Sequence, residues 1–123
     1  MEKISKKTLV IGASLNPSRY SNFVIQKLVA HGHEVVALGL KAGNIGGVKV
    51  ETDMLPYEGL DTITLYLNPN NQKAYYDYIV SLKPKRVIFN PGTENPELYQ
   101  ILRDHDIPFE AACSLVLLST NQY

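Results

Sequence analysis

A buried strand and the loop that follows it are encoded in the stretch TLVIGASLNPSR, from Thr8 to Arg19. The run Thr8–Gly12 is almost unbroken in apolar residues and ends in glycine, which is typical of a strand buried on both faces of a parallel sheet. Apolar residues then recur at helical spacing, so we predict a helix from about Tyr20 to His31, ended by Gly32. A second apolar run, Val35–Leu38, completes a right-handed βαβ unit.

The alternation of strands and helices continues along the rest of the chain. Further strands are predicted at Thr62–Leu67, Arg86–Asn90 and Ile107–Ala112, and helical stripes at Ala74–Leu82 and Leu98–Leu102. The stretch from Gly39 to Gly59 has little periodicity and predicts a loop with a short extended piece at Val48–Val50. We therefore expect residues 1–123 to form one α/β domain, doubly wound, with a mainly parallel sheet of about five strands.

The composition limits the classes of function. With 123 residues, of which 45% are apolar, the chain has enough material for one core but not for a second catalytic domain. The 12 Lys and Arg residues balance the 12 Asp and Glu residues. A neutral chain lacks the broad positive field with which proteins attract nucleic acids or anionic membranes, so we expect neither as a partner. Any site for an anion must therefore be local.

The location of the protein is predicted from what the sequence lacks. Residues 1–7 are basic, but the apolar stretch Leu9–Ala13 is shorter than the roughly 7–15 residues of a signal-peptide core. No stretch approaches the roughly 18 apolar residues of a membrane-spanning helix. A single cysteine forms no internal disulfide. These features favour a reducing, cytoplasmic location.

The loop after the first strand is the first candidate ligand site. In doubly wound sheets, ligands bind beyond the carboxyl ends of the strands, where the strand order reverses. This loop leads into a helix N-terminus, whose free N–H groups and dipole favour a phosphate. Gly12 would permit close approach of the backbone, and Arg19 carries a forked cation that suits phosphate oxygens. The loop matches neither the dinucleotide-binding glycine pattern nor the Walker motif, and its residue types also serve an ordinary turn with a surface arginine.

Three later loops add to this hypothesis. A Rossmann domain that prefers NAD has an acidic residue roughly 20 residues after its glycines, but Leu38–Lys41 contains no carboxylate. Lys41 would suit a phosphorylated ribose, although an ordinary solvated lysine explains it equally well. The loops Tyr66–Pro69 and Asn90–Glu94 both use Asn-Pro to end a strand. They are either turn and cap signals or sources of backbone amides and a Thr93 hydroxyl around a ligand.

These loops, taken in order, resemble those of the small stand-alone CoA-binding domain proteins. The resemblance rests chiefly on Asn16-Pro17-Ser18-Arg19 in the first loop, and also on Gly39–Gly47, Leu65–Pro69 and Phe89–Gly92. The family is similar to the nucleotide domain of the succinyl-CoA synthetase α subunit. The resemblance covers nearly the whole chain, and it implies a Rossmann-like fold of the NAD(P)-binding superfamily and a site for coenzyme A or an acyl-CoA.

The resemblance also implies which residues form the site. The first loop would hold phosphate and ribose together with Lys41, and the two later loops would line the adenine and pantetheine side. One departure concerns the ribose contacts, because Gly39-Leu40-Lys41 stands where the family commonly has Asn-Pro. The implied ligand-binding residues are Gly12, Ala13, Ser14, Asn16, Arg19, Tyr20, Lys41, Leu67, Asn68, Pro69, Asn90, Pro91, Gly92, Thr93 and Glu94.

No catalytic set is visible in the sequence, so we expect a binding protein rather than an enzyme. His31 and His33 are two residues apart and do not share a helix face, and no cysteine or carboxylate completes a metal-binding pattern. Cys113 stands in an apolar run, which favours an unreactive thiol. The resemblance implies that the phosphohistidine of the synthetase belongs to another domain, so we expect binding here without ligase chemistry.

Two other classes of function remain open. One is an NAD(P)-using redox enzyme or sensor, for which Lys41 favours NADP. The other is a protein-interaction domain that has lost its ligand. Five tyrosines bear on this second alternative, because an exposed tyrosine cluster would mark a surface for homodimer formation. They are Tyr75, Tyr76, Tyr78, Tyr99 and Tyr123.

Overall fold

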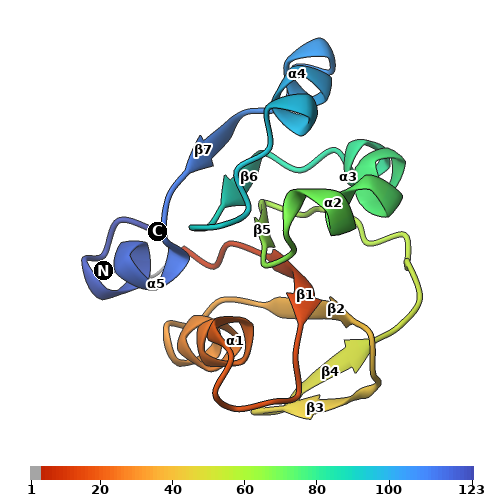
Figure 1. The fold of residues 1–123 in the computed structure, drawn as a ribbon. Coiled ribbons are helices and arrows are strands. Elements are labelled where there is room, and N and C mark those ends of the chain that lie inside the picture. The colour runs from red at the N-terminus through yellow and green to blue at the C-terminus, as the bar shows by residue number, and fades with distance from the viewer. Residues whose placement is uncertain (1–3) are drawn as a thin grey trace.

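The structure is a computed structural model that describes residues 4–123. These residues form one β-sheet with helices packed around it (Figure 1). Residues 1–3, which include part of the basic start considered above, lie outside the described residues. The strands are β1 (Thr8–Ala13), β2 (Val35–Gly39), β3 (Gly43–Ile45), β4 (Val48–Glu51), β5 (Thr62–Leu65), β6 (Arg86–Phe89) and β7 (Phe109–Ala111). The helices are α1 (Tyr20–Ala30), α2 (Pro69–Gln72), the 3₁₀ turn η1 (Lys73–Tyr75), α3 (Tyr76–Leu82), α4 (Pro96–Asp104) and α5 (Ser114–Ser119).

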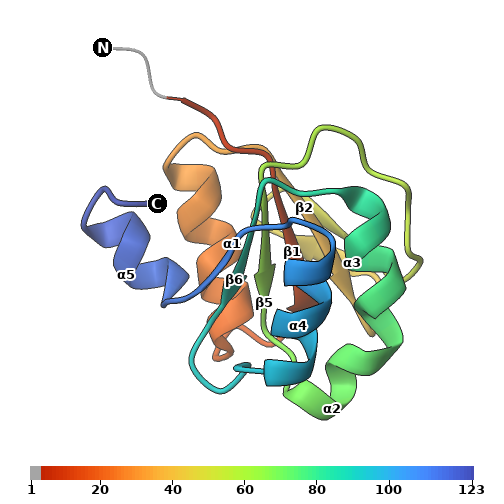
Figure 2. The ribbon, with the colours of Figure 1, turned by 90° about the horizontal axis from the view of Figure 1, so that it is seen from above.

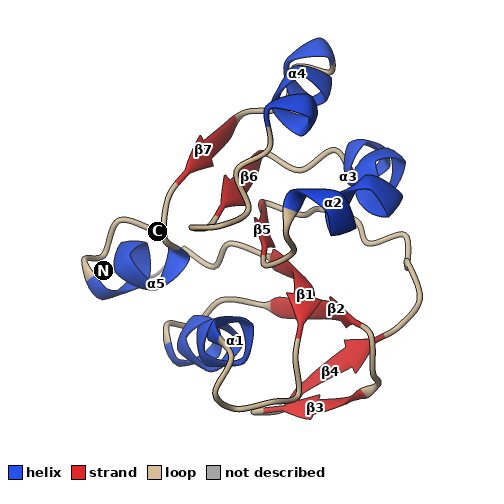
Figure 3. Ribbon diagram, in the orientation of Figure 1, coloured by secondary structure: helices blue, strands red, loops and turns tan. Residues whose placement is uncertain are grey.

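All seven strands belong to one sheet, in the order β3-β4-β2-β1-β5-β6-β7. Neighbouring strands from β4 to β7 run parallel, and β3 is antiparallel to β4. From β1, the chain first adds β2, β3 and β4 on one side of β1. It then returns to the other side of β1 and adds β5, β6 and β7 in turn. The strand order therefore reverses between β1 and β5 (Figure 3). The predicted doubly wound, mainly parallel sheet is confirmed.

The sheet is wider than the predicted five strands because the stretch after β2 folds into a hairpin. Ile45 pairs with Val48, which leaves Gly46 and Gly47 as a two-residue loop. Both glycines have positive φ, 55° and 90°, as the tightest hairpin turns require. The side-chain oxygen of Asn44 also accepts a hydrogen bond from the Gly47 N–H at 3.0 Å. The extended piece predicted at Val48–Val50 is confirmed as part of β4. The prediction that the residues before it form a loop was wrong, since the Gly-Gly pair is itself a hairpin signal.

Helices cover both faces of the sheet, as Figure 2 shows from above. Helices α1 and α5 lie on one face, and α2, α3 and α4 lie on the other. Successive residues of β1 divide between the two cores: Leu9 and Ile11 join the cluster under α3 and α4, and Val10 joins the cluster with Val24 and Leu28 of α1. Because β1 is buried on both faces, its continuous apolar pattern is explained.

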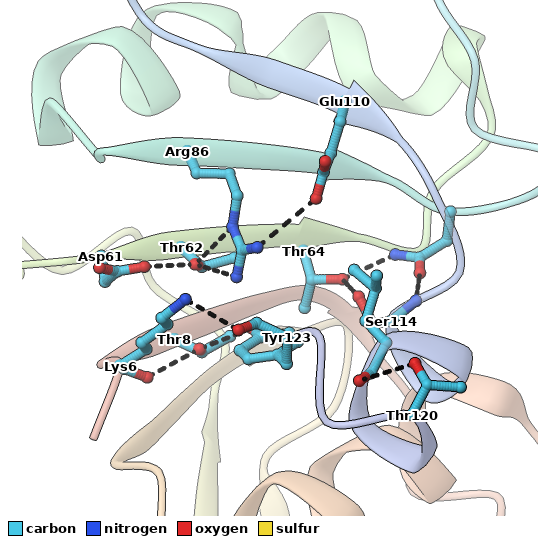
Figure 4. Close-up of polar contacts among 12 residues, drawn as sticks. Lys6, Thr8, Asp61, Thr62, Thr64, Arg86, Glu110, Ser114, Thr120 and Tyr123 are labelled. Atoms are coloured by element: carbon cyan, nitrogen blue, oxygen red, sulfur yellow. Dashed lines mark hydrogen bonds and ion pairs between the residues drawn. The ribbon is translucent and has the colours of Figure 1, made fainter. Parts of the chain in front are cut away.

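The C-terminal helix α5 is an element that the sequence analysis did not predict. Its apolar residues follow β7 directly, and its side chain Leu118 is buried against α1's side of the sheet. Beyond it, the Tyr123 hydroxyl hydrogen-bonds the Thr8 hydroxyl at 2.8 Å, and the guanidinium of Arg86 lies 4.7 Å from the centre of the Tyr123 ring (Figure 4). These contacts tie the last part of the chain to β1 and β6.

The tyrosines proposed as a self-association face are half-buried. Four of them pack against the core on the face of α2, α3 and α4, and Tyr123 packs against Thr8 and His33. The four are Tyr75, Tyr76, Tyr78 and Tyr99. The homodimer stays a prediction. Within residues 4–123, no helix combines the length and the apolar character that crossing a membrane requires.

Candidate functional site

A cleft of about 550 Å³ opens at the carboxyl ends of β1, β2, β5 and β6, where the strand order reverses. Its volume lies within the roughly 300–1,000 Å³ usual for small-molecule sites. Of the residues predicted for the site, the cleft is lined by Gly12, Ala13, Ser14, Asn16, Arg19, Tyr20, Lys41, Leu67, Asn68, Pro91, Gly92 and Thr93. The tertiary fold adds Leu15, Ser21, Gly39, Leu40, Tyr66 and Tyr75 to this lining. The loops that the sequence analysis selected thus meet at one place.

Two glycines allow the walls of the cleft to approach closely. Gly12 has a φ of 92°, and a Cβ there would lie 2.9 Å from the carbonyl carbon of Tyr66. A Cβ on Gly39 would overlap the carbonyl oxygen of Ala13. Any side chain at either position would push the ends of β1, β2 and β5 apart. The glycines therefore hold the loop after β1 close against its neighbouring strands.

The loop after β1 is held in place by its own side chains. Ser21 Oγ accepts a hydrogen bond from the Ser14 N–H at 3.1 Å, and Ser14 Oγ accepts one from the Asn16 N–H at 3.2 Å. Asn16 Oδ1 accepts hydrogen bonds from both the N–H and the hydroxyl of Ser18. Asn22 Nδ2 donates to the Ser14 carbonyl at 2.9 Å. Ser14 and Asn16, predicted as ligand contacts, thus also give the loop a defined shape.

The N-terminus of α1 faces the cleft without a cap of its own. Arg19 occupies the N-cap position and its side chain makes no capping hydrogen bond, whereas Asn68 and Asn95 cap α2 and α4. The first turn of α1 contains no acidic residue, so its dipole is not compensated from within the helix. Backbone N–H groups and a partial positive charge are thus available to an anion in the cleft.

Two cations stand beside this helix end. Arg19 and Lys41 both line the cleft and are exposed. Among residues 4–123, the ion pairs involve Lys7, Lys49 and Arg86, and neither cleft cation is in one. Leu40 lies between the end of β2 and Lys41 and is 89% exposed. A large apolar side chain in water at the rim is a surface on which a flat aromatic ring can pack.

Buried amides join the two remaining walls of the cleft. Gln72 Nε2 donates to the carbonyl oxygens of both Leu67 and Thr93 at 2.8 Å. Asn95 Nδ2 in turn donates to Gln72 Oε1 at 2.9 Å. The sequence analysis did not select Gln72 or Asn95, although Asn95 followed by Pro96 is a recognisable helix start. Nothing local in the sequence indicates that Gln72 bridges two loops.

Three predicted site residues lie outside the cleft lining. Pro69 is the first residue of α2. Asn90 is buried below the cleft, where its Nδ2 donates to Thr64 Oγ1 at 2.7 Å and to the Leu65 carbonyl at 2.8 Å. Its Oδ1 accepts from the Ser114 N–H at 2.9 Å, and the hydroxyls of Thr64 and Ser114 hydrogen-bond each other (Figure 4). Asn90 thus positions the wall of the cleft from behind.

Glu94, the third of these residues, reaches back to the turn before it. Its Oε1 accepts a hydrogen bond from the Gly92 N–H at 2.7 Å. Gly92 lines the cleft, so the carboxylate of Glu94 is held at the edge of the cleft beside β6.

The cleft offers a ligand hydrogen-bonding groups and positive charge. Its lining contains serine, threonine and amide side chains, two cations and no His, Cys, Asp or Glu. Burial raises the pKa of Tyr66 far above its ordinary value of 10.0, with a further contribution from Cys113 nearby, so this phenol stays protonated at neutral pH. Among residues 4–123, no group of three His, Cys, Asp or Glu side chains is placed to hold a metal ion.

Comparison with known families assigns the class of protein. A family model described as CoA binding domain matches residues 6–119. The chain therefore belongs to the CoA binding domain family. A comparison with curated proteins finds no significant match.

Solved structures support the assignment of the fold. An uncharacterised protein known from a crystal structure is 46% identical and aligns over 98% of this chain and 100% of its own, with a TM-score of 0.94. A conserved hypothetical protein from Pyrococcus furiosus is 25% identical over 90% of this chain and 97% of its own, with a TM-score of 0.81.

A larger relative shares the fold as one part of its length. The dinucleotide-forming acetyl-coenzyme A synthetase 1 of Candidatus Korarchaeum cryptofilum is 16% identical over 85% of this chain, with a TM-score of 0.70. Only 25% of the synthetase chain is covered. This similarity concerns the fold alone.

Proposed function

We propose that the cleft binds coenzyme A or an acyl-CoA and performs no chemistry on it. The observation that carries this proposal is the uncapped N-terminus of α1, which faces the cleft beside Arg19 and is suited to a diphosphate. Membership of the CoA binding domain family supports the same ligand.

In the proposed orientation, the parts of CoA follow the lining of the cleft in order. The diphosphate would lie on the first turn of α1, with Arg19 as its forked cation. The 3′-phosphate would lie near Lys41, and the adenine would pack on Leu40, which is otherwise in water. The pantetheine arm would then cross Leu67 toward the turn after β6. The missing carboxylate after β2 argues against an NAD-type ribose contact.

Thermal unfolding with a panel of nucleotides tests the proposal. A ligand at 100 times its dissociation constant stabilises a protein by about 2.7 kcal/mol, which should raise the melting midpoint of a domain of this size by about 10 °C. We expect CoA to produce a larger shift than 3′-dephospho-CoA, and NADH, NADPH and ADP to produce smaller shifts than CoA. A shift with NADPH alone would support a redox function instead. A result without any shift would leave a protein-interaction domain as the better account.

A further inference from the structure

The turn after β6 is rigid on the side that faces the protein. The buried residue Thr93 donates from its N–H and from its hydroxyl to the Asn90 carbonyl, at 2.9 and 2.7 Å. Its own carbonyl accepts from Gln72 Nε2 at 2.8 Å. The positions of Gly92 and Thr93 at the edge of the cleft are therefore defined by hydrogen bonds from both β6 and α2.

On the solvent side of this turn stands a negative charge. Glu94 is exposed, and its carboxylate is held by the Gly92 N–H at 2.7 Å. A hydrogen bond from a backbone N–H to an ionised carboxylate is stronger than one to a neutral acceptor. The charge is thus kept at the edge of the cleft instead of being free to swing away.

The charges around the cleft are arranged in order across the sheet. Arg19 is the N-cap residue of α1, in the loop after β1, Lys41 follows the end of β2, and Glu94 follows β6. The strands from β2 to β6 are consecutive neighbours in the order β2-β1-β5-β6. The two cations therefore lie in the lining of the cleft near β1 and β2, and the carboxylate of Glu94 lies just outside the lining, bonded to Gly92 near β6. A ligand would place its anionic groups at the end near β2 and a group without negative charge at the end near β6.

The length of CoA brings its acyl group to the carboxylate. From β1 to β6 there are two strand spacings, about 10 Å in total. The pantetheine arm contains two amide units and is at least as long as three extended residues, about 10 Å. Because the first turn of α1 and Gly92 line the same cleft, a diphosphate on that turn would leave the pantetheine arm long enough to bring the thioester toward the turn that holds Glu94.

We propose that Glu94 makes the site selective for CoA thioesters with an uncharged acyl group and against those whose acyl group ends in a carboxylate. This inference rests on the proposed function, because it needs CoA to lie in the cleft in the stated direction. A second negative charge within about 4 Å of Glu94 would weaken binding by at least about fivefold, even at the dielectric constant of water.

Two thioesters of equal chain length provide the test. Butyryl-CoA and succinyl-CoA both have four acyl carbons, and in succinyl-CoA a carboxylate replaces the terminal methyl group. We expect titration calorimetry to show that the protein binds butyryl-CoA at least fivefold more tightly. In Glu94→Gln, the side-chain oxygen still accepts from the Gly92 N–H while the charge is removed, so the affinity for succinyl-CoA should rise and the two affinities should become similar.

The matched control is Glu97→Gln, which removes an exposed carboxylate further along the chain, in the first turn of α4. Neither carboxylate is in the cleft lining, but Glu94 is bonded to Gly92, which is. Glu97→Gln should leave the preference for butyryl-CoA as in the unmodified protein. Equal affinities in the unmodified protein, or a preference that Glu97→Gln abolishes as well as Glu94→Gln, would overturn the inference. Either result would leave CoA binding itself intact. If CoA alone did not bind, the proposed function would fail, and the inference with it.

Discussion

Replacing Asn90 by alanine should destabilise the protein strongly, because this side chain joins three parts of the fold. It donates to Thr64 Oγ1 and to the Leu65 carbonyl, and it accepts from the Ser114 N–H. Asn90 is 2% exposed, so water does not readily replace it. A hydrogen bond contributes about 1 kcal/mol net, and a buried group left without its partner costs about 1–3 kcal/mol. We expect the free energy of unfolding to fall by about 3–5 kcal/mol.

The loss can be measured by urea and thermal unfolding. At about 2.1 cal/mol/K of unfolding entropy per residue, each 1 kcal/mol corresponds to about 4 °C in this domain, so the midpoint should fall by about 12–20 °C. Asn68→Ala is a matched control, since Asn68 is exposed and its side chain accepts one capping hydrogen bond at 2.9 Å. Asn68→Ala should lower the free energy of unfolding by only about 1 kcal/mol. A loss of less than about 1.5 kcal/mol in the free energy of unfolding of Asn90→Ala would refute this reasoning. It would show that water or other groups replace the hydrogen bonds of Asn90.

Three further predictions concern ligand affinity and pH. Arg19→Ala should weaken CoA binding, measured by calorimetry, by about 1.5–3 kcal/mol. The control Lys85→Ala removes an exposed cation before β6 and should leave CoA binding unchanged. Equal effects of the two substitutions would contradict a local role for Arg19. Lys41→Ala should weaken CoA binding by only about 0.2–1 kcal/mol, because an exposed ammonium is a single point charge, whereas the fork of Arg19 lies at the helix N-terminus. Lys41→Ala should not change 3′-dephospho-CoA binding; an equal loss for both ligands would exclude a contact with the 3′-phosphate. Burial raises the pKa of Tyr78 to about 12, and that of Tyr66 still further, above the ordinary value of 10.0. The folded protein therefore favours the neutral form of these two tyrosines. Their contribution to the free energy of unfolding is complete below about pH 10 and should be lost as the pH rises toward 12. Unfolding curves and tyrosinate absorbance that show no such loss would contradict this prediction.

Local pattern is sufficient for the elements whose burial it directly reflects. The run Thr8–Gly12 predicts a fully buried strand because both of its faces meet a core, and the spacing in α1 follows from one buried stripe. The Asn-Pro pairs predict turns because proline restricts the backbone around it. Most residues selected for the site do line one cleft, because parallel strands bring the loops at their carboxyl ends together.

The sequence pattern is not sufficient where a residue's role depends on a distant partner. The hairpin of β3 and β4 adds two strands to the sheet because β4 pairs with β2. Helix α5 packs against α1, although most of the chain lies between the two helices in the sequence. Gln72 bridges two walls of the cleft, and Asn90 lies behind the cleft instead of in it.

The sequence alone therefore determined the class of fold, most of its elements and the loops that line the cleft, since these follow from local periodicity and turn chemistry. Only the tertiary structure decided which polar side chains face the cleft and which support it. It also placed the carboxylate of Glu94 against the Gly92 N–H, beside the cleft that Arg19 and Lys41 line. The physical reason is that a buried polar group takes the partner that the packed sheet brings within hydrogen-bonding distance, and that partner can be more than 20 residues away, as for Asn90 and Ser114.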